Sequence, residues 1–190
     1  MTDLLKLTFG GGTVGAAASA ANTAENGYHF TAMEGNGVFT ANSHHGALAI
    51  QGPAAGTSNY AYKSVASQTL DFLTAFYVPA SIVAVSQFFR VTDAAGTTRY
   101  FHIDTTAGGL LRINDAANTA IYTGTVPLSV GWHVVRGRID SGTTTSDGKV
   151  NIEHYEGWAR TNPVETYTNT AANMGAGVTY GRAYMHKYGT

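Results

Sequence analysis

The chain has 190 residues, of which 12% are charged, and its formal net charge is -1 at pH 7. This length suits one domain with a substantial core, and the near-neutral balance without a basic run argues against a nucleic-acid partner. Cysteine is absent, which excludes disulfides and thiolate metal ligands. We therefore expect a single domain over residues 1–190.

The first third of the chain predicts few regular elements. It starts with MTDLLKLTFGGG, which lacks the apolar core of a signal peptide. The alanine-rich segment Thr13 to Thr23 contains Gly15 and no apolar stripe, which favours a surface loop over a helix. A strand is expected near Tyr28 to Thr31. No apolar run approaches the roughly 20 residues of a membrane helix, so a membrane partner is not expected.

Five segments from Val85 onward alternate apolar and polar residues with the period of a β-strand. They cover residues 85–91, 99–104, 111–113, 132–139 and 150–155. The pattern predicts an all-β, antiparallel two-sheet sandwich, with hairpin turns at Asp93 to Gly96 and at Ser146 to Gly148. Its predicted core residues are Phe89, Phe101, Ile103, Leu111, Ile113, Val135, Ile139, Val150 and Ile152.

The opposite face of the same segments carries arginines and aromatic rings. If the strands adjoin, they form one candidate binding patch of Arg90, Tyr100, His102, Arg112, Trp132, Arg136, Arg138, Glu153 and Tyr155. Such a composition is enriched in sugar-binding clefts and in protein interfaces. Alternatively, the arginines only cover the rings and pair with Glu153, which shields the sheet from water.

Catalytic chemistry finds little support in the sequence. Glycosidases of this architecture carry carboxylates at alternate positions of a strand, but Glu153 and Glu156 are three apart and face opposite sides. Glu153 is expected to pair with an arginine instead. A lyase set of Arg90, His102 and Tyr155 is possible, although no spacing identifies it. No G-x-S-x-G motif appears, and we expect a protein that is not an enzyme.

Metal and cofactor sites are not expected either. Adjacent His44 and His45 point to opposite faces of a strand, so they do not chelate one ion. His133 and His154 are expected to be buried neutral imidazoles bound to a backbone carbonyl. The segment Asp140 to Gly148 lacks the alternating acidic ligands of a calcium loop and fits a threonine-rich hairpin.

Several segments, in order, resemble concanavalin A-like, laminin G-like jelly rolls. They are LLKLTFGGGTVG, HHGALAIQG, FLTAFYVPAS, QFFRVTDAAGTTRYFHID, GGLLRINDAANTAIYTG and VPLSVGWHVVRGRID. The glycine-rich opening is most similar to virion proteins of tailed phages that infect actinobacteria, including minor tail proteins. The resemblance implies a jelly-roll fold, location in the virion, and other virion proteins as partners.

Members of this family usually close with a further strand, which the ending YGRAYMHKYGT does not match. We therefore expect an open sheet edge near Val178 to Tyr188, and self-association there or through Met1 to Phe9. A homo-oligomer, with a trimer as the first choice, follows from this expectation. The predicted function is a virion structural module acting by protein contacts. The alternative is a carbohydrate-binding domain for host surface glycan, and a polysaccharide lyase or hydrolase comes third.

Overall fold

The computed structural model describes residues 32–34, 38–40, 49–51, 59–78, 82 and 85–188. Within these ranges the regular elements are all strands. They are β1 (Ala32–Glu34), β2 (Val38–Thr40), β3 (Ala49–Gln51), β4 (Asn59–Ser67), β5 (Thr69–Val78), β6 (Gln87–Thr92), β7 (Arg99–Thr105), β8 (Leu110–Asn114), β9 (Ala120–Pro127), β10 (Gly131–Asp140), β11 (Gly148–Glu156), β12 (Glu165–Ala172) and β13 (Tyr180–Tyr188). The expectations for Met1 to Phe9, Thr13 to Thr23, Tyr28 to Thr31, His44 and His45 lie outside the described residues.

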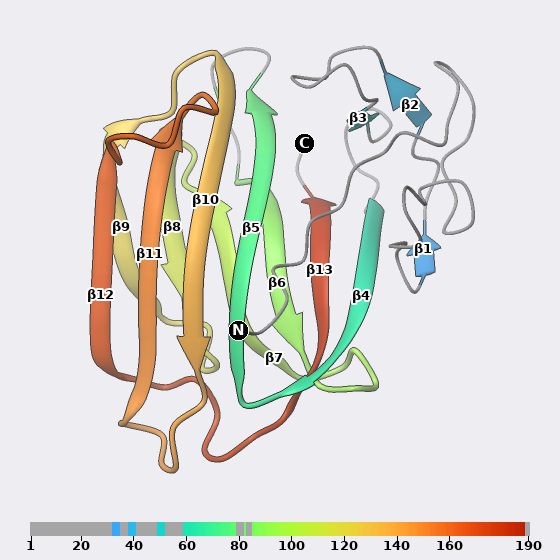
Figure 1. Cartoon of the computed structure of the whole chain (residues 1–190), viewed down its shortest axis with the longest axis vertical. Helices are drawn as coiled ribbons and strands as arrows, with labels where there is room; N and C mark the ends of the chain where they lie inside the picture. The colour runs from blue at the N-terminus through green and yellow to red at the C-terminus, as the bar shows by residue number, and fades with distance from the viewer. Residues whose placement is uncertain are drawn as a thin grey trace.

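Two antiparallel sheets pack face to face (Figure 1). The larger sheet has seven strands in the order β1-β4-β13-β6-β7-β8-β9, and the smaller has four in the order β12-β11-β10-β5. β2 and β3 pair with each other. The chain crosses between the sheets from β4 to β5, from β5 to β6, from β9 to β10 and from β12 to β13. The predicted all-β, antiparallel jelly-roll sandwich is therefore confirmed.

The core lies between the two sheets and is rich in aromatic rings. All nine predicted core residues are at most 2% exposed. Phe72 of β5 stacks on Phe89 of β6 with ring centroids 4.3 Å apart, and Phe101 packs edge-on to Phe89. Since these rings come from both sheets, they hold the layers together by burial of apolar surface.

The five predicted strands do not form one sheet. β6, β7 and β8 belong to the seven-stranded sheet, whereas β10 and β11 belong to the four-stranded sheet. The meander ends at β9, which pairs only with β8 among the described strands, and the chain then crosses to start β10. Alternation along a strand shows which face is buried, but it carries no information about which sheet the strand joins.

The expected open edge near Val178 to Tyr188 is wrong. β13 occupies this segment and lies inside the seven-stranded sheet, between β4 and β6 (Figure 1). Both of its sides are engaged in backbone hydrogen bonding, so it offers no edge for another chain. The edge strands of the described sheets are β1 and β9 in the larger and β12 and β5 in the smaller.

One of the two predicted turns is confirmed. Gly96 N donates to the Asp93 carbonyl at 3.1 Å, and Gly96 has a φ of +82°, which closes the β6–β7 hairpin. The hairpin predicted between β10 and β11 is present, but its turn precedes Gly148, because Gly148 already pairs with Ala172 and the positive φ of the connection falls at Gly142. There the Asp147 carboxylate accepts hydrogen bonds from threonines of the same connection.

Candidate functional site

The predicted patch is divided between two surfaces. Arg90, Tyr100, His102 and Arg112 belong to the seven-stranded sheet. The other five, which are Trp132, Arg136, Arg138, Glu153 and Tyr155, belong to the four-stranded sheet. Packed sheets lie about 10 Å apart with the core between them, so their outer faces point in opposite directions. A single patch of nine residues is therefore wrong, and the lyase set, which needs Tyr155 beside Arg90, is not assembled.

Two β-bulges change which side chains point outward. Phe88 is an extra residue between the pairs Gln87–Asp104 and Phe89–Ile103. It turns inward and stacks on Phe76 with centroids 4.0 Å apart. The bulge places consecutive phenylalanines in the core and moves Gln87 to the register of outward-facing Asp104.

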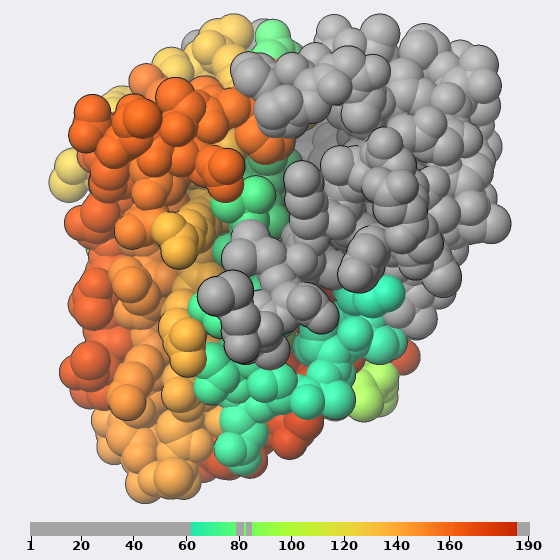
Figure 2. All heavy atoms as spheres, in the orientation of Figure 1, coloured from blue at the N-terminus to red at the C-terminus, as the bar shows by residue number. Residues whose placement is uncertain are grey.

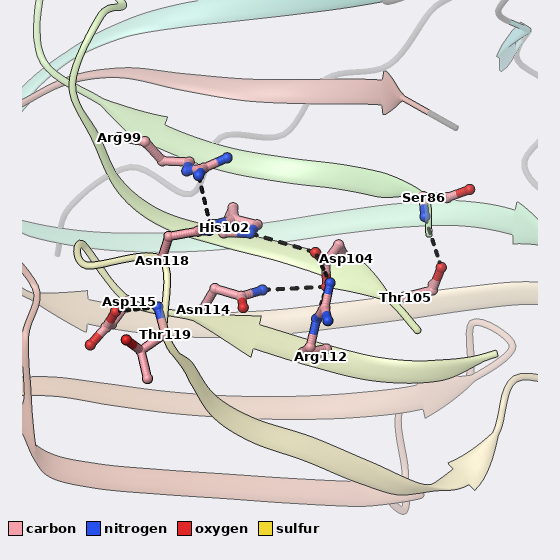
Figure 3. Close-up of polar contacts among 10 residues, drawn as sticks. All are labelled: Ser86, Arg99, His102, Asp104, Thr105, Arg112, Asn114, Asp115, Asn118 and Thr119. Carbon is pink, nitrogen blue, oxygen red and sulfur yellow. Dashed lines mark hydrogen bonds and ion pairs between the residues drawn. The ribbon is translucent and has the colours of Figure 1, made fainter. Parts of the chain in front are cut away.

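The second bulge is at Tyr100, between the pairs Val91–Phe101 and Thr92–Arg99. Tyr100 packs against the core and lies 6.0 Å from the ring of Tyr180. Its predicted place on the outer face is therefore wrong. Arg99 instead reaches the outer side, where its Nη2 donates to Asn118 Oδ1 at 2.7 Å (Figure 3).

Cross-strand pairing aligns one row of side chains on the outer face of the seven-stranded sheet. The row runs over β4, β13, β6, β7 and β8 and consists of Tyr62, Tyr184, Arg90, His102 and Asn114. The Tyr62 and Tyr184 rings lie 5.2 Å apart, and the Arg90 guanidinium lies 4.2 Å from the centre of the Tyr184 ring. We call these five residues the cross-strand row.

A buried carboxylate lies next to the row. Asp104 is 4% exposed and accepts two hydrogen bonds from Arg112, each 2.8 Å long, and one from Asn114 (Figure 3). His102 Nε2 is 3.5 Å from the second oxygen. Burial alone would raise the pKa of Asp104, but the hydrogen bonds from His102 and Arg112 outweigh it and the pKa is lowered. Asp104 is therefore ionised at neutral pH and unsuited to act as a general acid.

A shallow, open pocket of about 470 Å³ adjoins the row at the β6–β7 hairpin. Its lining is Arg90, Thr92, Gly96, Thr97, Thr98, Arg99 and Ala116. Two arginines and three threonines thus line the pocket, and no large apolar residue does. Burial lowers the pKa of Arg99, and the charge of Arg90 lowers it further, whereas the charge of Asp104 raises it.

The outer face of the four-stranded sheet carries paired charges. Arg136 Nη1 lies 3.6 Å from Glu153 Oε2, and Arg138 Nη1 lies 3.4 Å from Asp71 Oδ2. This confirms the expected arginine partner of Glu153, which also accepts a hydrogen bond from Tyr155 at 2.8 Å. β10, β11 and β12 form the yellow to red part of the face shown in Figure 2. Exposed pairs of this kind contribute little to stability.

Apolar side chains are exposed at one end of the sandwich. Tyr77 at the end of β5 is 43% exposed, as is Val85 before β6, and Val130 before β10 is 62% exposed. Trp132 lies 5.5 Å from the Tyr77 ring and 5.7 Å from the Trp158 ring. These five residues are called the apolar end. They lie where β5 and β11 end and where β6 and β10 begin, at the top of Figure 1.

A row of buried polar groups, the Ser129 carbonyl, His133, His154 and Glu165, lies in the interior near β12. His133 Nε2 is 2.8 Å from the Ser129 carbonyl oxygen, and its Nδ1 is 3.0 Å from His154 Nε2. The backbone partner expected for His133 is thus confirmed, whereas the one expected for His154 is wrong, because the His154 ring lies between His133 and Glu165. The carbonyl only accepts, so His133 Nε2 donates and His154 Nε2 donates to His133 in the neutral pair. His154 Nδ1 then faces Glu165 Oε2 at 3.8 Å without a proton.

Glu165 anchors these buried polar groups to the edge of the other sheet. Its Oε1 accepts the backbone N–H groups of Thr125 and Val126 in β9. Tyr122 of β9 stacks on Tyr167 of β12 with centroids 4.7 Å apart. The side of the sandwich between β9 and β12 is therefore closed by side chains, which reduces the pairing capacity of the β9 edge.

Within the described residues, no group of three or more histidine or acidic side chains could hold a metal ion. Nor does any helix in those ranges have the length and apolarity to cross a membrane. The sequence missed Tyr62, Tyr184, Asn114 and Arg99 as outer-face residues. The position of Arg99 could have been predicted, because it falls at the same alternating positions as Phe101 and Ile103, and a charged residue in an apolar register indicates a bulge.

The comparisons with known proteins identify no family. No family model matches the sequence, and no curated protein matches it. Among solved structures, the chain is similar to a β-glucanase of Bacillus licheniformis, with a TM-score of 0.38 and 14% sequence identity. That match covers 82% of this chain and 67% of the glucanase chain. A likeness at this level carries no argument about function.

Proposed function

We propose that this chain is a structural module of a phage virion that attaches through protein–protein contacts and performs no catalysis. The observation that carries the proposal is the apolar end. Tyr77, Val85 and Val130 are exposed together at one end of a sandwich whose other described large apolar side chains are at least partly covered. Exposed apolar surface of this kind marks contact sites for other proteins. The sequence resemblance to phage virion proteins supplies the setting.

The state of the acidic side chains supports a role without catalysis. Where side chains are described, each aspartate and glutamate has a hydrogen-bonding or ionic partner, for example Asp104 with Arg112 and Glu153 with Arg136. A glycosidase needs two carboxyl groups at a defined separation, one with a raised pKa. Release of reducing or unsaturated ends from a polysaccharide panel, lost on Glu153→Gln, would contradict the proposal.

Self-association is the first contact that we expect at the apolar end, since virion appendages are symmetric assemblies. Light scattering of the purified chain should show a homo-oligomer, and Val130→Asp should shift it towards the monomer. Arg138→Gln, an exposed change on the outer face of β10, is the matched control. If the wild-type chain is a monomer, the apolar end is expected to contact a different virion protein. Imaging of the particle would then show which protein lies against it.

Imaging of the purified particle tests the proposal as a whole. We expect density for this domain on the tail or the capsid surface, with the apolar end against a neighbouring chain. Particles that lack the protein would overturn the proposal. The second candidate, carbohydrate binding, is favoured by a separate observation, which is the cross-strand row with its adjoining pocket.

A further inference from the structure

The pocket beside the cross-strand row concentrates positive charge. Arg90 and Arg99 both line it, and its lining contains no carboxylate. Asp104 lies nearby, and its two oxygens are held by Arg112, Asn114 and His102. Two guanidinium groups close together repel each other, and an anion between them would relieve that repulsion.

The donors of the pocket are held in place before any ligand arrives. The Arg90 guanidinium lies over the Tyr184 ring, and Arg182 lies 4.5 Å from the centre of the Tyr62 ring and donates to the Tyr184 hydroxyl. Arg99 is held by Asn118. Such stacking and hydrogen bonding lower the entropy lost on binding.

The hairpin backbone closes tightly over this cluster. A Cβ added at Gly96 would lie 2.5 Å from the Tyr184 hydroxyl and 2.6 Å from Arg182 Nη1, and the φ of +82° at this position favours glycine. Thr97 is fixed by Asp93, which accepts from its backbone N–H at 2.8 Å and from its hydroxyl at 2.9 Å. The threonine oxygens keep lone pairs for donors on a ligand.

We propose that this pocket binds an acidic saccharide, with the sugar carboxylate between Arg90 and Arg99 and the sugar hydroxyls on Thr97 and Thr98. The guanidinium fork matches the geometry of a carboxylate. A volume of about 470 Å³ is within the usual range for small-ligand sites. The lack of large apolar side chains in the lining argues against an apolar ligand.

This inference rests on the carbohydrate-binding candidate and is independent of virion attachment. The pocket lies where β6 ends, whereas the apolar end lies where β6 begins. A ligand is thus free to bind while the opposite end is attached. Loss of one property in a variant therefore leaves the other measurable.

Calorimetric titration of the full chain tests the ligand class. The probes are oligogalacturonate, an oligosaccharide containing glucuronate, a neutral galactose oligosaccharide of equal length, and inorganic phosphate. We expect at least one acidic saccharide to bind at least tenfold more tightly than the neutral one, with weaker binding at high salt. No binding of either acidic probe, or equal binding of the neutral probe, overturns the proposal. Phosphate that binds as tightly as the saccharides overturns the saccharide assignment.

Three variants place the binding in the pocket. Arg99→Gln should weaken binding of the acidic probe at least tenfold. Asn118→Asp keeps the side-chain shape but puts a carboxylate on Arg99, so it should weaken binding similarly, and Asp tolerates the positive φ of 61° at this position. Arg136→Gln, on the opposite sheet, should leave binding unchanged.

Melting temperatures show that the variants are folded, and Asn118→Asp decides the question if Arg99→Gln does not fold. If Asn118→Asp binds the acidic probe as tightly as the wild type, or if Arg136→Gln loses as much affinity as Arg99→Gln, the ligand does not bind in this pocket.

Discussion

Phe101 shows how much a single core ring contributes. Its side chain is fully buried and contacts Phe72 and Phe89, so it joins both sheets. Phe101→Ala should lower the free energy of unfolding by about 3–5 kcal/mol, because it removes apolar contacts and leaves a cavity. Phe101→Leu, which keeps most of the volume, should cost less than about 1.5 kcal/mol. Urea unfolding measures both, and equal stability of Phe101→Ala and the wild type would show that the ring is not buried.

His154 predicts how stability depends on pH. Burial, and then the adjacent His133, lower its pKa from the ordinary 6.5 to about 4, although Glu165 and Glu156 oppose the shift. Between these values the unfolded chain binds more protons than the folded one. The free energy of unfolding should therefore fall as the pH drops from about 6.5 to about 4, by about 3 kcal/mol in total.

The matched variant for this effect is His154→Gln. It cannot take up a proton, so its urea midpoint should change less over the same pH range. Asp93 and Asp147 have pKa values lowered to about 2, so their contribution to the free energy of unfolding is lost only below about pH 4. An unchanged slope in His154→Gln would assign the acid sensitivity to other groups.

At the scale of elements, β10 depends on a glycine. A Cβ at Gly137 would clash with the ring of Phe72 and would lie 2.6 Å from Ile152 Cδ1, both on neighbouring strands. Gly137→Ala should cost about 1–3 kcal/mol through overpacking. Gly108→Ala is the control, since its Cβ would meet only Thr106 Oγ1 at 3.8 Å. Thermal unfolding of both compares them, and equal melting temperatures would contradict the tight packing of β10.

At the scale of the whole molecule, the two ends of the sandwich have different surfaces. The apolar end is proposed for attachment, and the pocket at the opposite end for the acidic ligand. Val130→Asp should therefore reduce association and leave binding of the acidic saccharide unchanged. Arg99→Gln should do the reverse. Light scattering and calorimetry on both variants test this separation, and a joint loss in either variant would show that the two surfaces depend on each other.

The sequence alone was sufficient for the fold class and for part of the core. Period-two alternation predicted β6, β7, β8, β10 and β11, and all nine residues that it predicted for the core are buried. This works because the pleat sends successive side chains to opposite faces, whatever the strand pairs with. The backbone hydrogen-bonding partner of buried His133 was also predicted, since a polar ring in an apolar register needs such a partner.

Only the tertiary structure decided where the outward residues meet. The division of the predicted patch depends on the crossing after β9, and the bulges at Phe88 and Tyr100 reverse the face of Gln87 and Arg99. The insertion of β13 between β4 and β6 brings Tyr184 beside Arg90 from a distant part of the chain. Strand partners and register come from contacts remote in sequence, whereas alternation is a local property of each strand.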